Sequence, residues 1–335
     1  MNINVKQPYK LCDFKPTYGI VFSDYLIDFD FWGYCDLDII FGQIRSFVTE
    51  EELCKYEVFS FRKQYPSGFF MLFKNTERIN NLFRKSKDHK MILCSEEHYC
   101  FDECNFIHDY LMQGLNISEI EASVESMYHV ITREIGQHAL KASFKLWAGE
   151  GLPGEIEWRN GILTFKSRYQ LLLFHLIDFK NNFYSRPYKG ALKPESVFKI
   201  NRYCITLGSP ISLVYIYDEK LRPTILKGLH HMEYFVSRAF KRRFMKKEIS
   251  GSYRYWNNDV VINEEGLISF KSTLSGTYKL FTSSFNAERL FLEGKLGVTL
   301  LLNYGHQNEV KGFRWIDSIG TTKNYKKLTD LRKLN

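Results

Sequence analysis

Apolar and polar positions alternate along the first 180 residues in a way that predicts strands separated by helices. Some apolar runs have the length of a buried strand, and other segments carry apolar residues three and four positions apart, as one face of a helix does. The predicted strands are residues 29–35, 56–61 and 68–74, and the predicted helices are residues 9–28, 76–86 and 102–114. Pro16 interrupts the first helix, so we expect a kink or a later start there. Strands that alternate with helices are typical of an α/β layer structure.

Two further elements follow in this part of the chain. Residues 154–165 predict a β-hairpin, because Asn160-Gly161 is a dipeptide that a type I′ turn favours. Residues 168–179 are an apolar run that predicts a buried strand, with His175 in its second half.

The pattern changes after residue 200. Residues 226–248 predict one long basic helix, and residues 252–318 predict short strands separated by turn signals. We therefore expect a boundary near residues 195–200, with one domain over 1–197 and a helix-plus-strand region over 198–335.

Composition and charge narrow the classes of function. The net charge of +8 favours anionic partners, and the 16% of aromatic residues suits sites that stack flat ligands such as sugars. The seven cysteines include no CxxC pair, and Cys100 and Cys104 lack a second ligand pair, so we expect reduced thiols and no zinc site. No signal-peptide pattern, long apolar run or nucleic-acid-binding motif is present, so we expect a cytoplasmic protein without a nucleic-acid partner.

Asp36-Leu37-Asp38 has the clearest chemical meaning. On a strand, residues i and i+2 point to the same side, so two carboxylates at a strand end repel each other unless a cation lies between them. A divalent metal that prefers oxygen ligands meets this need, and it can offset the charge of a diphosphate leaving group. A solvated turn, where aspartate is common, is the alternative.

Six ordered motifs extend this pattern within residues 8–185. They are PYKLCDFKPTYGIVFSDYL, DFWGYCDLDIIFGQIRSF, GFFMLFKNTERINNLF, CFDE, IEWRNGILTF and FHLIDFK. Together they resemble a group of bacterial glycosyltransferase-like proteins from polysaccharide gene clusters. The resemblance implies a GT-A-like, Rossmann-like mixed sheet flanked by helices, followed by the C-terminal helix and β-rich region. It also implies Mn²⁺ or Mg²⁺ as cofactor and a nucleotide sugar, with UDP-sugars favoured, as donor.

The resemblance also assigns metal and phosphate ligands. Asp36 and Asp38 would bind the metal, and His175 would complete its ligand set as a neutral imidazole. Lys180 would contact the diphosphate as a point charge. The Gly and the Pro-Trp that usually accompany this His–Lys pattern are missing here. A hydrogen-bonded core histidine is therefore the alternative for His175.

Further residues would surround the donor and the acceptor. Asp13 and Lys15 lie where related sugar transferases place an acidic and a basic residue near the donor; an ordinary surface charge pair is the alternative. Asp102 or Glu103 would orient or deprotonate the acceptor hydroxyl, and the alternative is that both only favour the first turn of a helix. Aromatic rings that could stack on a sugar or base are those of Trp32, Tyr34, Phe69 and Trp158, and a place in the core is the alternative for each.

The predicted helix at 226–248 combines an apolar side with a basic end. The apolar residues are Leu229, Met232, Phe235, Val236, Phe240 and Phe244, and the basic ones are Arg238, Lys241, Arg242, Arg243, Lys246 and Lys247. Such a helix suits peripheral contact with an anionic membrane, which would place the protein at the inner face of the membrane. A helix docked on the core with a solvated basic end is the alternative.

The motif order departs from the family at one point. A complete GT-A domain carries a nucleotide-binding βαβ unit before its DxD motif, which begins here at Asp36. We therefore expect a domain that is truncated at its N-terminus. A fragment, a partner chain that supplies the missing half, and a degenerate relative all remain open.

These observations lead to two expectations of function. The first is a metal-dependent glycosyltransferase that moves a sugar from a nucleotide-sugar donor to a surface polysaccharide or a lipid-linked glycan acceptor. The second is a non-catalytic glycan-binding or scaffold protein derived from that fold.

Overall fold

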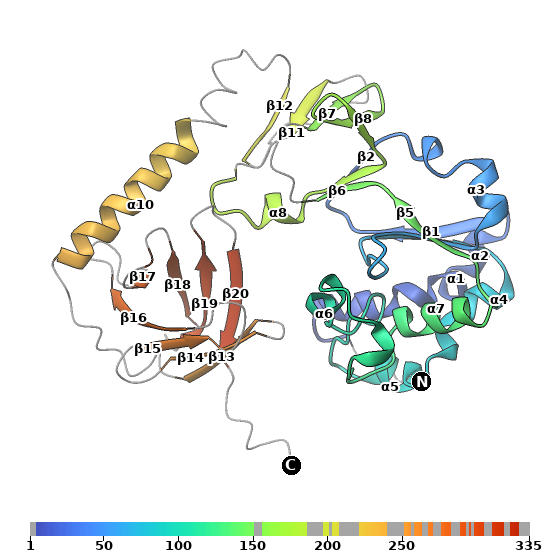
Figure 1. Cartoon of the computed structure of the whole chain (residues 1–335), viewed down its shortest axis with the longest axis horizontal. Coiled ribbons are helices and arrows are strands. Elements are labelled where there is room, and N and C mark those ends of the chain that lie inside the picture. The colour runs from blue at the N-terminus through green and yellow to red at the C-terminus, as the bar shows by residue number, and fades with distance from the viewer. Residues whose placement is uncertain are drawn as a thin grey trace. The chain divides into compact units, whose positions relative to one another are not determined.

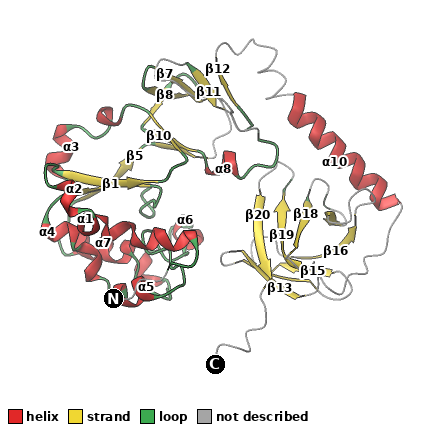
Figure 2. Cartoon of the chain, turned by 180° about the vertical axis from the view of Figure 1, so that it is seen from behind, coloured by secondary structure: helices red, strands yellow, loops and turns green. Residues whose placement is uncertain are grey.

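The chain is a mixed α/β protein in the computed structural model, which describes residues 5–150, 156–185, 197–200, 203–207 and 221–239, and most of eight strands between residues 251 and 327. The chain folds into two compact units (Figures 1 and 2). The first comprises Met1–Glu150 and Gly161–His175, and the second comprises Gly151–Asn160 and Leu176–Asn335. After the predicted hairpin, the chain passes from the first unit to the second at His175, which is earlier than the boundary expected near residues 195–200. No helix of the described residues is long and apolar enough to cross a lipid bilayer.

The first unit begins with three short helices where one was predicted. A 3₁₀-helix, η1 (Pro8–Thr17), leads into α1 (Tyr18–Val21) and α2 (Ser23–Leu26). Regular α-helix therefore starts only after Pro16, as the proline predicted. Much of the apolar row that suggested the helix is exposed, including Leu11 and Tyr25. The side chains that η1 buries are instead polar, and they include Lys10, Asp13 and Lys15.

A four-stranded mixed sheet forms the centre of this unit. Its order is β1 (Phe31–Cys35), β4 (Phe70–Lys74), β3 (Val58–Phe61) and β5 (Ala142–Leu146). The β3–β5 pair is parallel, and the other two pairs are antiparallel. All three strands predicted before residue 75 are thus confirmed. Helices gather along one face of this sheet in Figure 1, where they close an apolar core around Trp32, Tyr34 and Phe73.

The helices of the first unit are short. They are α3 (Glu50–Lys55), α4 (Glu77–Asn80), η3 (Leu82–Lys85), α5 (His89–Cys94), α6 (His108–Met112) and α7 (Met127–Gly136), with single 3₁₀ turns η2 (Ile44–Ser46) and η4 (Ile117–Glu119). Local chemistry begins several of them: the Thr49 side chain caps α3, and Ser126 and His129 form a capping box at α7. The predicted helix at 102–114 is confirmed only as α6. Asn105 and Phe106 have φ angles of 54° and 62°, which exclude a helix through that turn.

The first unit also contains a three-stranded sheet. Its order is β2 (Ile39–Phe41), β10 (Leu173–His175) and β6 (Ala148–Glu150). The predicted strand at 168–179 is therefore split: β9 (Tyr169–Leu171) and β10 are strands, and the chain then turns into α8 (Ile177–Lys180). Strand β8 (Ile162–Phe165) pairs with β9. The predicted hairpin turn is confirmed, because Asn160 and Gly161 have φ angles of 49° and 81°, as a type I′ turn requires. Residues 154–155 of that prediction lie outside the described residues.

The second unit holds a short sheet, one long helix and a closed sheet. Strand β11 (Phe198–Ile200) pairs with β12 (Ile205–Leu207) and with β7 (Ile156–Arg159). Helix α10 (Arg222–Ala239) confirms the described part of the predicted basic helix. Residues 240–248 of the predicted helix lie outside the described residues. They include Phe240, Lys241, Arg242, Arg243, Phe244, Lys246 and Lys247.

Eight antiparallel strands at the C-terminal end close into a barrel, in which β20 pairs back with β13. They are β13 (Gly251–Tyr255), β14 (Asn258–Ile262), β15 (Leu267–Phe270), β16 (Gly276–Thr282), β17 (Arg289–Leu292), β18 (Thr299–Tyr304), β19 (Val310–Ile316) and β20 (Thr322–Lys327). Alternate apolar side chains fill an inner core, among them Leu300 and Phe313. The strand-rich prediction for 252–318 is confirmed, and Tyr234 of α10 packs on Phe291 of β17.

Candidate metal centre

Asp36 and Asp38 lie in the short connection between β1 and β2, which belong to different sheets. The Asp36 N–H donates to the Phe69 carbonyl at 2.9 Å, so the β1–β4 ladder continues to this residue. Leu37 between the two aspartates is fully exposed. The two carboxylates therefore lie on the opposite side from Leu37, as the i, i+2 spacing predicted.

His175 reaches the same place through strand pairing. Strand β10 runs between β2 and β6, and the register places His175 opposite Ile39 on one side and Glu150 on the other. One ligand atom each from Asp36, Asp38 and His175 lies within 4.8 Å of the others. The structure thus brings together the three residues predicted as metal ligands.

The orientation of the His175 ring is fixed by its neighbours. Its Nδ1 lies 2.8 Å from Glu150 Oε1, and Glu150 in turn pairs with Arg62. Its Nε2 faces the aspartates, 3.5 Å from Asp38 Oδ2 and 3.9 Å from Asp36 Oδ2. Only 4% of the His175 side chain is exposed.

This geometry fits a divalent cation. A carboxylate acceptor at Nδ1 assigns the ring proton to that nitrogen, which leaves the lone pair of Nε2 directed toward two anionic oxygens. Buried Nε2 makes no hydrogen bond within the part of the chain that the structure describes. A histidine that is oriented by a carboxylate on one nitrogen and faces anionic oxygens with the other matches a metal ligand with its supporting group. Two carboxylates and one imidazole suit Mn²⁺ or Mg²⁺.

Lys15 supplies a fixed positive charge beside this centre. Its Nζ lies 2.7 Å from Asp36 Oδ1, 2.7 Å from the Gly68 carbonyl oxygen and 3.6 Å from Asp102 Oδ2. Burial lowers the pKa of Lys15, but Asp102 and Asp36 outweigh this effect, so its pKa is above the usual value and the side chain is charged. Asp36 thus turns one oxygen to Lys15 and the other to His175.

Asp13 belongs to a different, fully buried network. Its carboxylate accepts hydrogen bonds from Lys10, from His98 and from the backbone N–H groups of Tyr99 and Phe101. Burial raises the pKa of Asp13, and the hydrogen bonds from His98 and the backbone outweigh it, so the pKa lies below the usual value. The structure therefore places Asp13 in a network that fastens η1 to residues 98–101, and Asp13 is not a surface charge.

Asp102 and Glu103 lie in a turn before α6, so the prediction that they begin a helix is wrong. Burial raises the pKa of Asp102 well above its usual value, despite the nearby Lys15. Glu103 accepts hydrogen bonds from the Gly68 N–H at 2.5 Å and from His108 at 2.6 Å. Burial raises the pKa of Glu103, but these hydrogen bonds outweigh it and hold the pKa below its usual value.

Two further predicted residues, Trp32 and Tyr34, belong to the apolar core of the first unit. Trp32 is 4% exposed, stacks on Phe73 at 4.7 Å between ring centroids, and donates its indole N–H to Asn80. Tyr34 is buried beneath Lys15, whose Nζ lies 5.5 Å from the centroid of the ring. Both rings are thus part of the core. Lys180 is an exposed residue at the end of α8 in the second unit.

Sequence analysis did not find the supporting residues Glu150, Arg62 and Gly68. Glu150 and Arg62 are 88 positions apart, and no local spacing relates either to Asp36. Gly68 gave one signal, since a glycine before an apolar strand often marks close backbone approach. A Cβ at Gly68 would lie 2.3 Å from Asp102 Oδ2, so a larger residue there would displace this carboxylate.

Comparisons with known proteins give one match. A family model described as "Family of unknown function (DUF6625)" matches residues 1–182, which include every residue of the candidate centre. No curated protein and no solved structure matches the chain.

Proposed function

We propose that this chain, which belongs to the DUF6625 family, is a metal-dependent glycosyltransferase that transfers a sugar from a nucleotide-sugar donor to a surface polysaccharide or lipid-linked glycan. One observation carries the proposal: His175, oriented by Glu150, faces Asp36 and Asp38 with its second ring nitrogen. The ordered motifs that resemble GT-A proteins and the mixed β1-β4-β3-β5 sheet support it.

Each group of the centre then has a chemical task. Asp36, Asp38 and His175 would hold Mn²⁺ or Mg²⁺, which when bound offsets the charge of a departing nucleoside diphosphate. Lys15 adds a second fixed positive charge beside Asp36. Burial raises the pKa of Asp102 well above its usual value, and the neighbouring Lys15 opposes this shift. A general-base role for Asp102 or Glu103 on the acceptor stays a prediction.

Release of nucleotide from a donor panel tests the proposal. The purified chain is incubated with UDP-, GDP- and CDP-sugars, with and without Mn²⁺, and free nucleoside diphosphate is measured. We expect one nucleotide class to be released only with metal, and a loss of at least about 100-fold in Asp38→Asn, because a ligand is removed. Exposed Asp28→Asn is the matched control and should keep full activity. Release that does not depend on metal or on Asp38 would contradict the proposal.

One observation favours the second candidate, a non-catalytic glycan-binding or scaffold protein. Lys15 already neutralises Asp36 at 2.7 Å, which is part of what a metal would do there. Under this alternative, Asp36→Ala and Asp38→Ala would leave glycan binding intact and no donor would be turned over. Membrane contact through residues 226–248 and a partner chain that completes the domain also stay predictions.

A further inference from the structure

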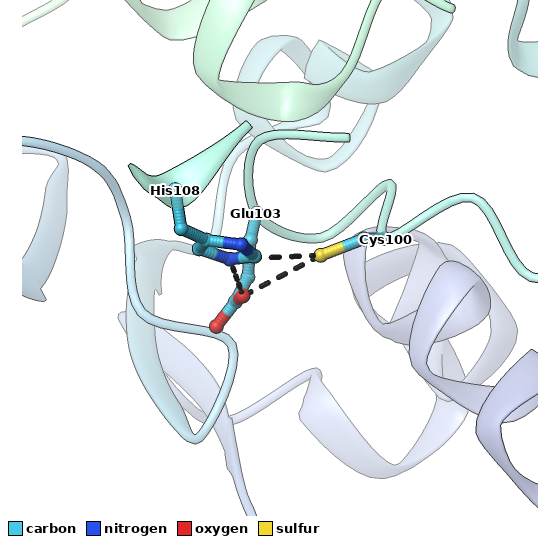
Figure 3. A group of neighbouring side chains, drawn as sticks. All are labelled: Cys100, Glu103 and His108. Carbon is cyan, nitrogen blue, oxygen red and sulfur yellow. Dashed lines mark hydrogen bonds and ion pairs between the residues drawn. The ribbon is translucent and has the colours of Figure 1, made fainter. Parts of the chain in front are cut away.

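Cys100, Glu103 and His108 form a second cluster of ligand atoms in the first unit (Figure 3). Cys100 Sγ lies 3.4 Å from Glu103 Oε2, and that oxygen lies 2.6 Å from His108 Nε2. The third side of the triangle, from Cys100 Sγ to His108 Nε2, is 3.9 Å. A sulfur, an oxygen and a nitrogen thus converge on one point.

The backbone is bent to bring these three side chains together. Cys100, Asn105 and Phe106 have φ angles of 52°, 54° and 62°, in the left-handed region that residues other than glycine rarely adopt. The Asn105 side chain holds the turn, since it donates to the Tyr99 carbonyl and accepts from the N–H of Ser123. Several unfavourable conformations that the surroundings fix in one short loop are typical of functional sites.

The triangle has the size of one face of a tetrahedral metal site. Zinc lies about 2.3 Å from sulfur and about 2.0–2.2 Å from nitrogen or oxygen, so neighbouring ligand atoms are about 3.3–3.6 Å apart. Two observed sides, at 3.4 and 3.9 Å, lie close to this range. Only the hydrogen-bonded pair of Glu103 and His108, at 2.6 Å, has to open when a cation replaces the shared proton.

The environment favours metal binding over a reactive thiol. Cys100 is 3% exposed, so the rest of the protein shields its thiol. Nucleophilic cysteines are accessible, whereas a bound metal can displace the proton of a buried thiol. The other Glu103 oxygen is held by the Gly68 N–H, and the ring of Tyr65 packs edge-on against His108. Both contacts orient ligands.

We propose that Cys100, Glu103 and His108 bind Zn²⁺ or a cation of similar preference, at a site separate from Asp36, Asp38 and His175. A thiolate, an imidazole and a carboxylate select zinc over the hard cations that an oxygen-rich centre takes. This proposal departs from the expectation of no zinc site, which rested on the missing second ligand pair beside Cys100 and Cys104. Cys104, the other member of the pair, is not among the three ligands.

The second site is joined to the first through Gly68. The N–H of Gly68 donates to Glu103, and its carbonyl accepts from Lys15, which pairs with Asp36. Zinc at Glu103 therefore fixes the segment on which Lys15 rests. The role that follows for this zinc is structural, because it holds in place the groups beside the centre formed by Asp36, Asp38 and His175.

Cobalt serves as a spectroscopic probe of this proposal, because a cobalt–thiolate bond absorbs strongly in the near ultraviolet. The full-length chain is freed of metal with a chelator and titrated with Co²⁺, and Zn²⁺ is then added. We expect the thiolate band to saturate at one equivalent, and stoichiometric Zn²⁺ to remove it. The affinity for Co²⁺ should fall at least about 100-fold in His108→Ala, and the band should be absent in Cys100→Ala.

Two controls separate this site from other thiols and from the proposed catalytic centre. Cys94→Ala removes an exposed thiol, and Asp38→Asn removes a ligand of the oxygen-rich centre; both should keep the band. Because Cys100 is buried, circular dichroism checks that its variant is folded, and half-buried His108→Ala and Glu103→Gln repeat the test independently. A folded wild-type chain without a thiolate band, or a band that persists in both Cys100→Ala and His108→Ala, would overturn the proposal. Loss of the band in Asp38→Asn alone would assign it to the other site and also overturn it.

Discussion

Lys15 is the residue on which the charges of the candidate centre converge. Its ammonium group lies 2.7 Å from Asp36 Oδ1 and 3.6 Å from Asp102 Oδ2. A positive charge at this place stabilises the two carboxylates but opposes a second cation on Asp36. The affinity of the centre for metal therefore depends on the balance between Lys15 and the ion.

Replacement of Lys15 measures this balance. We expect Lys15→Met to raise the affinity for Mn²⁺ about tenfold, because a like charge a few ångströms from the ion is removed. Titration of free Mn²⁺ by electron paramagnetic resonance gives the dissociation constant, and exposed Lys63→Met is the matched control. A lower affinity in Lys15→Met would mean that the lysine mainly holds Asp36 in position.

Asp13 gives a prediction about pH. Its folded-state pKa lies below the usual value of 3.8, so its charge stabilises the fold above that pH and the stabilisation is lost as pH falls through the folded pKa. Asp13→Asn should lower the free energy of unfolding by about 3–5 kcal/mol at pH 7, since buried Lys10 loses its charged partner.

Urea unfolding at several pH values checks this prediction. The difference between wild type and Asp13→Asn should be constant above about pH 5 and shrink as the pH falls below 3.8. Asp28→Asn, at an exposed site, should change stability by less than about 0.5 kcal/mol. A difference that stays constant down to pH 2 would show that the charge of Asp13 does not stabilise the fold.

At the level of residues, sequence reasoning found the ligands better than it found their supports. Asp36, Asp38 and His175 come together because strand geometry relates the first two and an apolar strand carries the third. Glu150 meets His175 only through the pairing of β6 with β10, which no local pattern encodes. Asp13 has the residue type that a donor site needs, but its burial against Lys10 depends on tertiary packing.

The turn around Gly68 is the element that both clusters share. A Cβ there would lie 2.3 Å from Asp102 Oδ2 and 2.9 Å from Glu103 Oε1. We expect Gly68→Ala to displace both carboxylates, to destabilise the chain by at least about 2 kcal/mol, and to weaken Mn²⁺ and Co²⁺ binding together.

Gly136 is the matched control for this change. It is the last residue of α7, and a Cβ there would meet nothing within 4 Å. Gly136→Ala should leave metal binding unchanged and leave stability unchanged or raise it by up to about 1 kcal/mol, because alanine favours a helix. Thermal melts with both metals give the two readouts. An unchanged Gly68→Ala would contradict the link between the clusters.

At the level of elements, strands were easier to predict than helices. Apolar runs fixed β1, β3 and β4, and Asn160-Gly161 identified a turn with two positive φ angles. The prediction of a helix at 102–114 is wrong over its first half, where Asn105 and Phe106 have left-handed backbone conformations. No sequence pattern indicated them, because neither residue is glycine and the apolar spacing does not report backbone conformation. The long helix at the start became η1, α1 and α2, since its buried side chains are polar.

The whole molecule has two units, each with its own apolar core. Ile131 is fully buried in the first unit and Leu300 in the closed sheet of the second. Because separate cores can unfold separately, we expect calorimetry to resolve two transitions, of which Ile131→Ala lowers one and Leu300→Ala the other. Each change should lower the free energy of unfolding of its own unit by about 2–5 kcal/mol, because it leaves a cavity in the core. A single transition that both variants lower equally would contradict this division.

The sequence predicted the two kinds of region in this molecule, but it did not predict that the C-terminal strands close into a barrel. It separated an α/β part from a strand-rich part, and the closed sheet of β13–β20 contains the strands expected over 252–318. That β20 returns to β13 could not be read from the pattern, because the two strands are far apart in sequence and alternation does not specify a partner.

Binding of Mn²⁺ to the full-length chain tests the central claim most directly. Electron paramagnetic resonance should detect one Mn²⁺ site in the wild type, and Asp38→Asn and His175→Ala should abolish it. Glu150→Gln should weaken it about 10–100-fold, because the ring of His175 loses its orienting acceptor, while Asp28→Asn leaves it unchanged. Equal Mn²⁺ affinity in wild type, Asp38→Asn and Glu150→Gln would contradict the account.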